Sequence, residues 1–428
     1  MVHLVCCVIL FILIIFSIKG PLKRVKWNPW IFYTFFAAGL GIFVISFLHP
    51  IGDGYRAFSF IMMFGFPCLY YVWNNRRDYD TLYKMLASGT SIAVILYYLL
   101  FIYLASKGAL MIAYGYGRVS VTCRDPNMLS MIGMIAVNSA FYMLTVNRNS
   151  KAWLALTAVS MGTGCSLTFI GGSRLSTLVI AGSFVIFVIY YIKTSADITE
   201  ARTKGLRLCR AAIVIAAVAT FVLLGNTMLT LNDMVAADNA AQAQISESAE
   251  VEEEPVDSQP AEVSPEQAAQ ETETDDVIER IVDSTNATDA DSFLSGRLTL
   301  WRNYSQFLNM TGNDFSKADW DALNKDCAPA KHAHNNFFEL AFRCGIPVAC
   351  IHILLELMAG IICLIWLFGR KYREPFYLFC IISMCCYALE SMFDIATLPF
   401  ERPAPFYFYM AMIPVFTFRQ PEETEENA

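Results

Sequence analysis

The residues best suited to chemistry lie between positions 295 and 347, where a polar stretch interrupts an otherwise apolar chain. Three arginines and two histidines gather there, namely Arg297, Arg302, Arg343, His332 and His334. Arginine binds phosphate through a planar fork of donors, and histidine takes up or releases a proton near neutral pH. The stretch therefore predicts a site that holds an anion and moves a proton.

Arg174 is a further candidate, because it follows Gly171-Gly172-Ser173 in a turn between two apolar segments. A guanidinium at a membrane boundary is costly unless it is paired. Two interpretations are open: Arg174 binds a phosphate group, or its long side chain merely reaches the interface. The two glycines favour binding, since they would let a ligand approach the backbone.

The other candidate residues also have more than one possible role. Arg297 either binds a ligand or belongs to an ordinary solvated helix face. His334 is the candidate general base, with His332 as the competing assignment and a helix cap or packing role as the alternative. The carboxylate of Asp125 could act as a base, but before Pro126 it could equally cap a helix.

The cysteines give no sign of a metal site. Most of the thirteen lie in apolar runs, where cysteine behaves as a small hydrophobic residue. The chain contains neither a C-x-x-C pair nor an H-E-x-x-H motif. We therefore expect no metal and no cofactor.

Composition indicates an all-α polytopic membrane protein. Hydrophobic residues make up 56% of the chain and charged residues only 16%, against roughly 25% charged in soluble domains. The net charge of -7 comes largely from residues 247–283, which hold fourteen acidic side chains and one arginine. The charge therefore says little about partners, and nucleic acid is not expected among them.

Eleven segments are long and apolar enough to be candidate spans. They are roughly 2–18, 29–48, 57–74, 85–105, 127–146, 152–170, 174–192, 211–231, 346–368, 375–393 and 404–418. The odd-numbered connections between them carry the clusters of Lys and Arg, which places those connections in the cytoplasm. The even-numbered connections, 49–56, 106–126, 171–173, 232–345 and 394–403, are then external.

The domain organisation follows from these spans. Residues 1–231 hold the first eight and residues 346–418 the last three, with a cytoplasmic tail at 419–428. The acidic, aromatic-poor segment 232–290 is expected to be a disordered external spacer. Residues 291–345 are expected to form a lid of two helices, the first bearing Leu298 and Trp301, the second starting near His334 or Asn335 and ending at Gly345-Ile346-Pro347.

Four motifs, taken in order, resemble the O-antigen ligase and O-antigen polymerase family of bacterial envelope enzymes. They are Arg124-Asp125-Pro126-Asn127, then Gly172-Ser173-Arg174-Leu175-Ser176, then Gly296-Arg297 followed by Trp301, and finally His334-Asn335-Asn336-Phe337-Phe338-Glu339-Leu340 running to Gly345-Ile346-Pro347. The resemblance spans roughly residues 118–368, and the last two motifs share one large external loop.

The resemblance implies transfer of a glycan from an undecaprenyl pyrophosphate carrier to a glycan acceptor, on the outer face of the bacterial plasma membrane and without a metal ion. Arg174 and Arg297 would hold the pyrophosphate, and His334 would activate the acceptor hydroxyl. We also expect substrate contacts from a further set of residues, Arg118, Arg124, Asp125, Asn335 and Arg302.

These motifs do not separate a polymerase from a ligase. We favour a polysaccharide polymerase, because nothing in the sequence identifies a lipopolysaccharide acceptor. Two alternatives belong to other classes: a polysaccharide flippase or transporter, in which the arginines would line a route across the bilayer, and a non-catalytic envelope scaffold. Against transport, the predicted cations gather at one face, with Glu356 and Asp394 as the nearest charges within spans.

Overall fold

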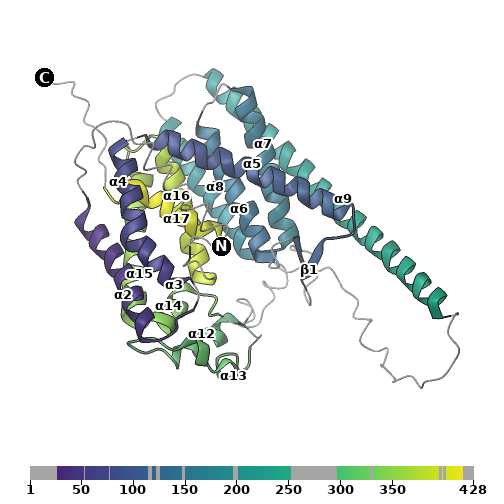
Figure 1. Ribbon diagram of the computed structural model, residues 1–428. Helices are drawn as coiled ribbons and strands as arrows, with labels where there is room; N and C mark the ends of the chain where they lie inside the picture. The colour runs from purple at the N-terminus through teal and green to yellow at the C-terminus, as the bar shows by residue number, and fades with distance from the viewer. Residues whose placement is uncertain are drawn as a thin grey trace, which may run out of the picture.

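Helices make up nearly all of the regular structure in the computed structural model (Figure 1). The structure describes residues 27–52, 54–76, 78–113, 118–121, 126–146, 150–195, 201–251, 296–327, 330, 332–394, 398 and 402–417. The helices that precede the large loop are α2 (Pro29–Leu48), α3 (Tyr55–Phe60), the π-helical turn η1 (Ile61–Gly65), α4 (Phe66–Arg76), α5 (Tyr79–Ala105), α6 (Pro126–Thr145), α7 (Lys151–Gly171), α8 (Arg174–Ser195) and α9 (Ala201–Val251).

The second half of the chain supplies the remaining elements. They are α12 (Arg297–Ser305), the 3-10 turn η3 (Phe315–Lys317), α13 (Trp320–Leu323), α14 (Asn336–Cys344), α15 (Ile346–Phe368), α16 (Pro375–Phe393) and α17 (Pro403–Val415). One short antiparallel hairpin, β1 (Met111–Ala113) with β2 (Arg118–Val121), lies in the connection between α5 and α6. The expected all-α membrane fold is confirmed, with this hairpin as its small exception.

Nine helical segments in the described part of the chain are long and apolar enough to cross a membrane. They correspond to nine of the eleven expected spans, with α3, η1 and α4 forming one of them. The expected span at 2–18 lies outside the described residues. The expected span at 404–418 differs, because α17 has only 13 residues, which is short of the ~20 that a bilayer requires.

The shortness of α17 follows from its prolines and its surroundings. Proline starts the helix at Pro403 and recurs near its end at Pro414, where it lacks a donor for the helical ladder. Most side chains of α17 are buried, and it packs against α16, α4 and α6. A helix covered on all sides by protein can be apolar without spanning the bilayer.

The helix α9 is longer than expected. It runs without interruption for 51 residues to Val251, about 75 Å at the usual helical rise, and its far end extends away from the other helices (Figure 1). The expected disordered spacer therefore begins as helix, because its first twenty residues are rich in Ala and Gln, which favour that conformation. The remainder of the expected spacer lies outside the described residues.

The connections expected on one face do meet at one end of the bundle. The helices α12, α13 and α14 lie together there (Figure 1), and Phe315 N donates to Pro50 O of the connection after α2 at 2.9 Å. At the opposite end, Lys193 of α8 donates to the carbonyl of Tyr372 at 2.7 Å. The described parts of an expected external connection and of an expected cytoplasmic connection therefore lie at opposite ends of the bundle.

Candidate functional site

Arg174 is the first residue of α8, and α6 shapes the turn that precedes it. A side chain at Gly171 would not fit, because its Cβ would lie 2.3 Å from Oγ of Ser130 on α6. That same hydroxyl accepts a hydrogen bond from Ser173 N at 3.3 Å, and Gly172 takes a left-handed φ of 62°. The glycines thus serve helix packing and the turn, and they do not expose the backbone as the sequence suggested.

Arg297 is the first residue of α12, directly after Gly296 with its left-handed φ of 76°. The helix is attached to the histidine segment by Trp301, whose Nε1 donates to Ala333 O at 2.9 Å. The Trp301 ring also stacks on Phe338 of α14, with centroids 6.0 Å apart. The helix that carries Arg297 is therefore fixed to the residues on both sides of His334.

The backbone of His334 has a φ of 48°, a left-handed value that is uncommon outside glycine and costs about 1–3 kcal/mol. Both polar backbone groups of the preceding Ala333 are held, since its N–H donates to Glu339 Oε2 at 2.9 Å and its carbonyl accepts from Trp301. These contacts keep His334 in a conformation that an unsupported chain would leave.

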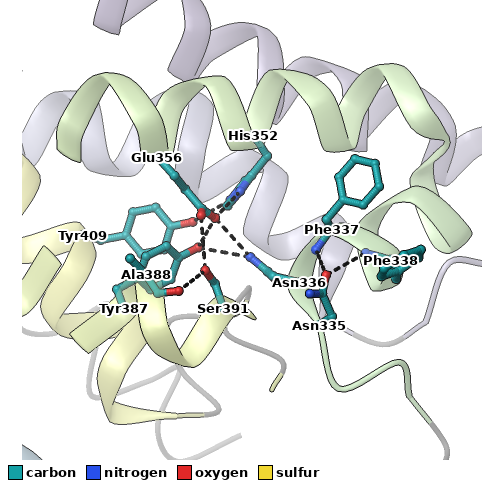
Figure 2. A network of polar contacts seen from close by, with 10 residues as sticks. All are labelled: Asn335, Asn336, Phe337, Phe338, His352, Glu356, Tyr387, Ala388, Ser391 and Tyr409. Atoms are coloured by element: carbon teal, nitrogen blue, oxygen red, sulfur yellow. Dashed lines mark hydrogen bonds and ion pairs between the residues drawn. The ribbon is translucent and has the colours of Figure 1, made fainter. Parts of the chain in front are cut away.

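The helix cap falls on Asn335 and not on His334. The Asn335 side chain accepts from Phe337 N at 3.0 Å and Phe338 N at 3.2 Å (Figure 2), and its Nδ2 donates to Met392 O at 2.9 Å. The cap interpretation of His334 is therefore set aside, and the imidazole remains available for other contacts. The sequence predicts that Asn335 binds substrate, but in the structure its side chain caps the start of α14.

The imidazole of His334 faces Asp394, the residue that follows α16. His334 Nδ1 lies 3.3 Å from Asp394 Oδ1, and Arg402 Nη1 donates to the other carboxylate oxygen. Asp394 is 3% exposed, whereas 26% of the His334 side chain is exposed. A carboxylate on Nδ1 fixes the ring so that Nε2 carries the lone pair that can accept a proton.

Asp394 is held in its ionised form. Burial alone would raise its pKa, but the hydrogen bond with His334 and the positive charge of Arg402 keep the pKa of Asp394 below its ordinary value. The carboxylate therefore stays negative at neutral pH and can stabilise a positive charge that develops on His334.

Three other charged residues of the site influence the pKa of Arg297. Burial lowers its pKa, the like charge of Arg174 lowers it further, and Asp394 and Glu390 act in the opposite direction. A guanidinium remains protonated in any of these surroundings. Arg297 of α12 is thus within electrostatic reach of Arg174 of α8 and of Asp394, the carboxylate that faces His334.

His332 differs from His334 in its surroundings. The two rings meet edge to face with centroids 4.0 Å apart, and His332 Nδ1 is buried without a hydrogen-bond partner. Burial, helped by the charge of His334, lowers the pKa of His332 to about 3. His332 is therefore neutral at physiological pH, and no carboxylate is hydrogen-bonded to its Nδ1 to support it as a base.

The donor atoms of His332, His334 and Asp394 lie within 4.8 Å of one another, a set that could hold a metal ion. Arg402 already occupies one oxygen of that carboxylate, and Arg297 adds a second positive charge nearby. Two arginines therefore already act on the carboxylate that a metal ion would need.

The remaining sequence candidates have other positions. Arg302 is exposed on α12, five residues and therefore about 140° around the helix from Arg297. Arg118 belongs to β2, and its side chain lies outside the described part of the structure, as do Arg124 and Asp125. Arg302 is the one candidate that the structure places away from the site.

Sequence reasoning missed the carboxylates and the third arginine of the site. Asp394 had been counted as a charge within a span, and Glu390 and Arg402 had no assigned role. A usable signal did exist, because Asp394 follows the last apolar residue of α16 and opens an expected external connection. A charge at that boundary faces the site and not the bilayer.

Comparison with known proteins gives one family match. The family model described as O-antigen ligase matches residues 158–353. This segment contains Arg174, Arg297 and His334 and confirms the resemblance drawn from the motifs. No curated protein matches the chain.

Proposed function

We propose that this chain joins glycan repeat units carried on undecaprenyl pyrophosphate, because residues 158–353 match a family model described as O-antigen ligase, a family of glycan-transferring enzymes. The observation that supports the proposal is that Arg297 of α12 lies within electrostatic reach of Arg174 of α8 and of Asp394, the carboxylate that faces His334. Paired cations suit a pyrophosphate, and a supported imidazole suits a hydroxyl nucleophile.

In the proposed reaction, the acceptor hydroxyl attacks the anomeric carbon of the donor sugar. The bond from that carbon to the pyrophosphate oxygen breaks, and its electron pair leaves with the lipid pyrophosphate. His334 Nε2 takes the hydroxyl proton, and Asp394 stabilises the imidazolium that forms. Arg174 and Arg297 meet the negative charge that grows on the leaving group, which lowers the barrier.

The proposed setting is the outer face of the bacterial plasma membrane, with membrane lipid around the spans and a donor that arrives from the lipid phase. A metal ion is not required in this scheme, because arginines neutralise the pyrophosphate. We favour the polymerase over the ligase on the same ground as before, the lack of a recognisable lipopolysaccharide acceptor site. A transporter is less well supported, since the site cations lie at one end of the bundle.

The test is a transfer assay with purified protein in lipid, given a lipid-linked repeat unit and a divalent-ion chelator. Longer lipid-linked chains support the polymerase, and transfer to a different acceptor supports the ligase. Loss of transfer on chelation would show that a metal is needed. No transfer of either kind by folded protein would reject the enzyme proposal.

Variants of the site residues make the test specific. Arg174→Ala, Arg297→Ala and His334→Ala are each expected to reduce transfer by roughly 100-fold or more, and Asp394→Asn to act in the same direction. Arg302→Ala is the matched control, because Arg302 is exposed on the same helix as Arg297. Equal losses in Arg302→Ala and Arg297→Ala would contradict the pyrophosphate site.

A further inference from the structure

A mostly enclosed carboxylate within α15, with 12% of its side chain exposed, takes no part in the proposed reaction. Glu356 is the eleventh of the 23 residues of this helix, well inside a membrane-spanning segment. An ionisable side chain at such depth is expensive and usually marks a functional position. Its surroundings in Figure 2 show a network of polar contacts from α14, α15, α16 and α17.

Hydrogen-bond donors surround Glu356. Oε1 accepts from Asn336 Nδ2 at 3.3 Å and from Tyr387 OH at 3.1 Å, and Oε2 accepts from Ser391 Oγ at 3.2 Å. The side chain of His352 completes the group, with Nδ1 3.0 Å from Oε1. Three hydrogen bonds and the adjacent imidazole therefore surround the carboxyl group.

The network reaches the active-site segment through Asn336. This residue is fully buried, it is the first residue of α14, and its Nδ2 also donates to Tyr387 OH at 3.2 Å. Three consecutive residues are thereby attached to the neighbouring spans: His334 to Asp394, Asn335 to Met392 O, and Asn336 to Glu356. The last of these attachments is the deepest in the bundle.

We propose that Glu356 is a positioning residue for His334. Through Asn336 it holds the start of α14 in place, and this keeps the strained backbone of His334, just before the helix, in the conformation that turns the imidazole toward Asp394. The inference rests on the proposed function of His334. A positioning role would explain why a carboxylate lies inside the membrane. For packing alone, an apolar side chain would avoid the cost of burying a charge.

Two readouts test this role, and one does not depend on activity. In Glu356→Leu, kcat is expected to fall by roughly 100-fold, the effect of a misplacement of about 1 Å, while KM for the lipid-linked donor stays within about twofold, because Arg174 and Arg297 are untouched. Hydrogen–deuterium exchange of the backbone amides at 335–345 is expected to become faster. Glu356→Gln, which keeps one acceptor oxygen, should fall between Glu356→Leu and the wild type.

Tyr98→Phe is the matched control for Tyr387→Phe. Both hydroxyls make hydrogen bonds inside the bundle, but Tyr98 contacts Ser166 and Phe221 O on α7 and α9, in a different apolar cluster. Tyr387→Phe is expected to lower kcat and raise exchange at 335–345, and Tyr98→Phe to change neither. Because Asn336→Ala breaks the same link, combining it with Glu356→Leu should add little further loss.

Several outcomes would overturn the proposal: wild-type kcat in Glu356→Leu, unchanged exchange at 335–345, or the same loss in Tyr98→Phe as in Tyr387→Phe. A raised KM with unchanged kcat would also overturn it, since Glu356 would then serve substrate binding. If the wild-type protein shows no transfer but the exchange responds as expected, the proposed function fails while the hold of Glu356 on α14 stands.

Discussion

Two histidines two residues apart have different prospects for proton transfer. His334 faces a buried, ionised carboxylate and is partly exposed, whereas the buried Nδ1 of His332 has no hydrogen-bond partner. The difference comes from Asp394, which lies some 60 residues further along the chain. The choice between the two histidines, open in the sequence, therefore depends on tertiary structure, and the structure supports His334.

The depressed pKa of His332 makes a prediction about stability. The folded value is about 3, against about 6.5 in an unfolded chain. Between these values the unfolded chain binds more protons than the folded protein, so stability falls as the pH is lowered from 6.5 towards 3. His332→Gln removes that contribution, and its unfolding temperature should drop less than that of the wild type between pH 7 and pH 4.5.

Thermal unfolding in detergent, measured for both proteins at the two pH values, checks this prediction. The same drop in the variant and the wild type would show that His332 is already protonated in the fold. At pH 7 His332→Gln is expected to retain most of its transfer activity, in contrast to His334→Ala.

How far the site could be predicted differs from residue to residue. Arg174, Arg297 and His334 each lie in a local motif, and one carboxylate, Asp394, is close to two of them. Glu390 and Arg402 lie in no local motif. Their positions at the site depend on how α16 and the start of α17 pack. The roles of Gly171 and Gly172 were also beyond the sequence, because the nearness of Ser130 on α6 cannot be seen in their own segment.

At the scale of elements, Arg343 connects α14 to the connection after α2. Arg343 donates to Glu339 within the helix, its guanidinium donates to Ile51 O at 2.8 Å, and it lies 3.5 Å from the ring centroid of Phe315. Gly52 is needed beside it, because a Cβ there would meet Arg343 Nη1 at 2.1 Å. Glu339 is thus engaged through both oxygens and is not a candidate base.

Breaking this pair from one side should be costly. Glu339 is fully buried, so Arg343→Met leaves a carboxylate without its counter-charge, and we expect a loss of about 3–5 kcal/mol in the free energy of unfolding. Arg302→Met is the control, since a substitution at that exposed arginine should cost no more than about 0.5 kcal/mol.

Chemical denaturation of the two variants in detergent measures the difference. Adding Glu339→Leu to Arg343→Met should restore part of the loss, because no isolated charge then remains. A double variant less stable than Arg343→Met alone would show that the hydrogen bond from Ala333 N to the Glu339 carboxylate matters more than the ion pair.

The elements themselves were predictable where apolar length alone defines them. The spans α2, α6, α15 and α16 fall close to their expected bounds, because about 20 apolar residues have few other solutions. The ends of α9 and α17 were not predictable in this way. The first continues through a polar, alanine-rich segment that favours helix, and the second is short because other helices, and not lipid, surround it.

For the whole molecule, the arrangement has two distinct ends. Phe315 and Arg343 contact the connection after α2 at one end, and Lys193 contacts the connection after α15 at the other. Lys193 and Lys371, from two of the basic connections, lie at this second end, the end that the positive-inside rule would assign to the cytoplasm.

Orientation can be tested with a membrane-impermeant thiol reagent on intact cells, in a background without native cysteines. Ser305→Cys on α12 and Lys371→Cys after α15 are suitable positions, since both residues are exposed. Ser305→Cys is expected to be labelled before lysis, and Lys371→Cys only after lysis. The reverse pattern would place the site in the cytoplasm and contradict the proposed setting.

The separation of the site residues along the chain has a consequence for biosynthesis. Arg174 precedes Asp394 by about 220 residues, and the ribosome delivers the carboxylate only after α16. A nascent chain therefore inserts Arg174, Arg297 and His334 first and gains Asp394 and then Arg402 last. Until α16 has entered the bilayer the proposed centre lacks its carboxylate, so we expect an incomplete chain to be inactive.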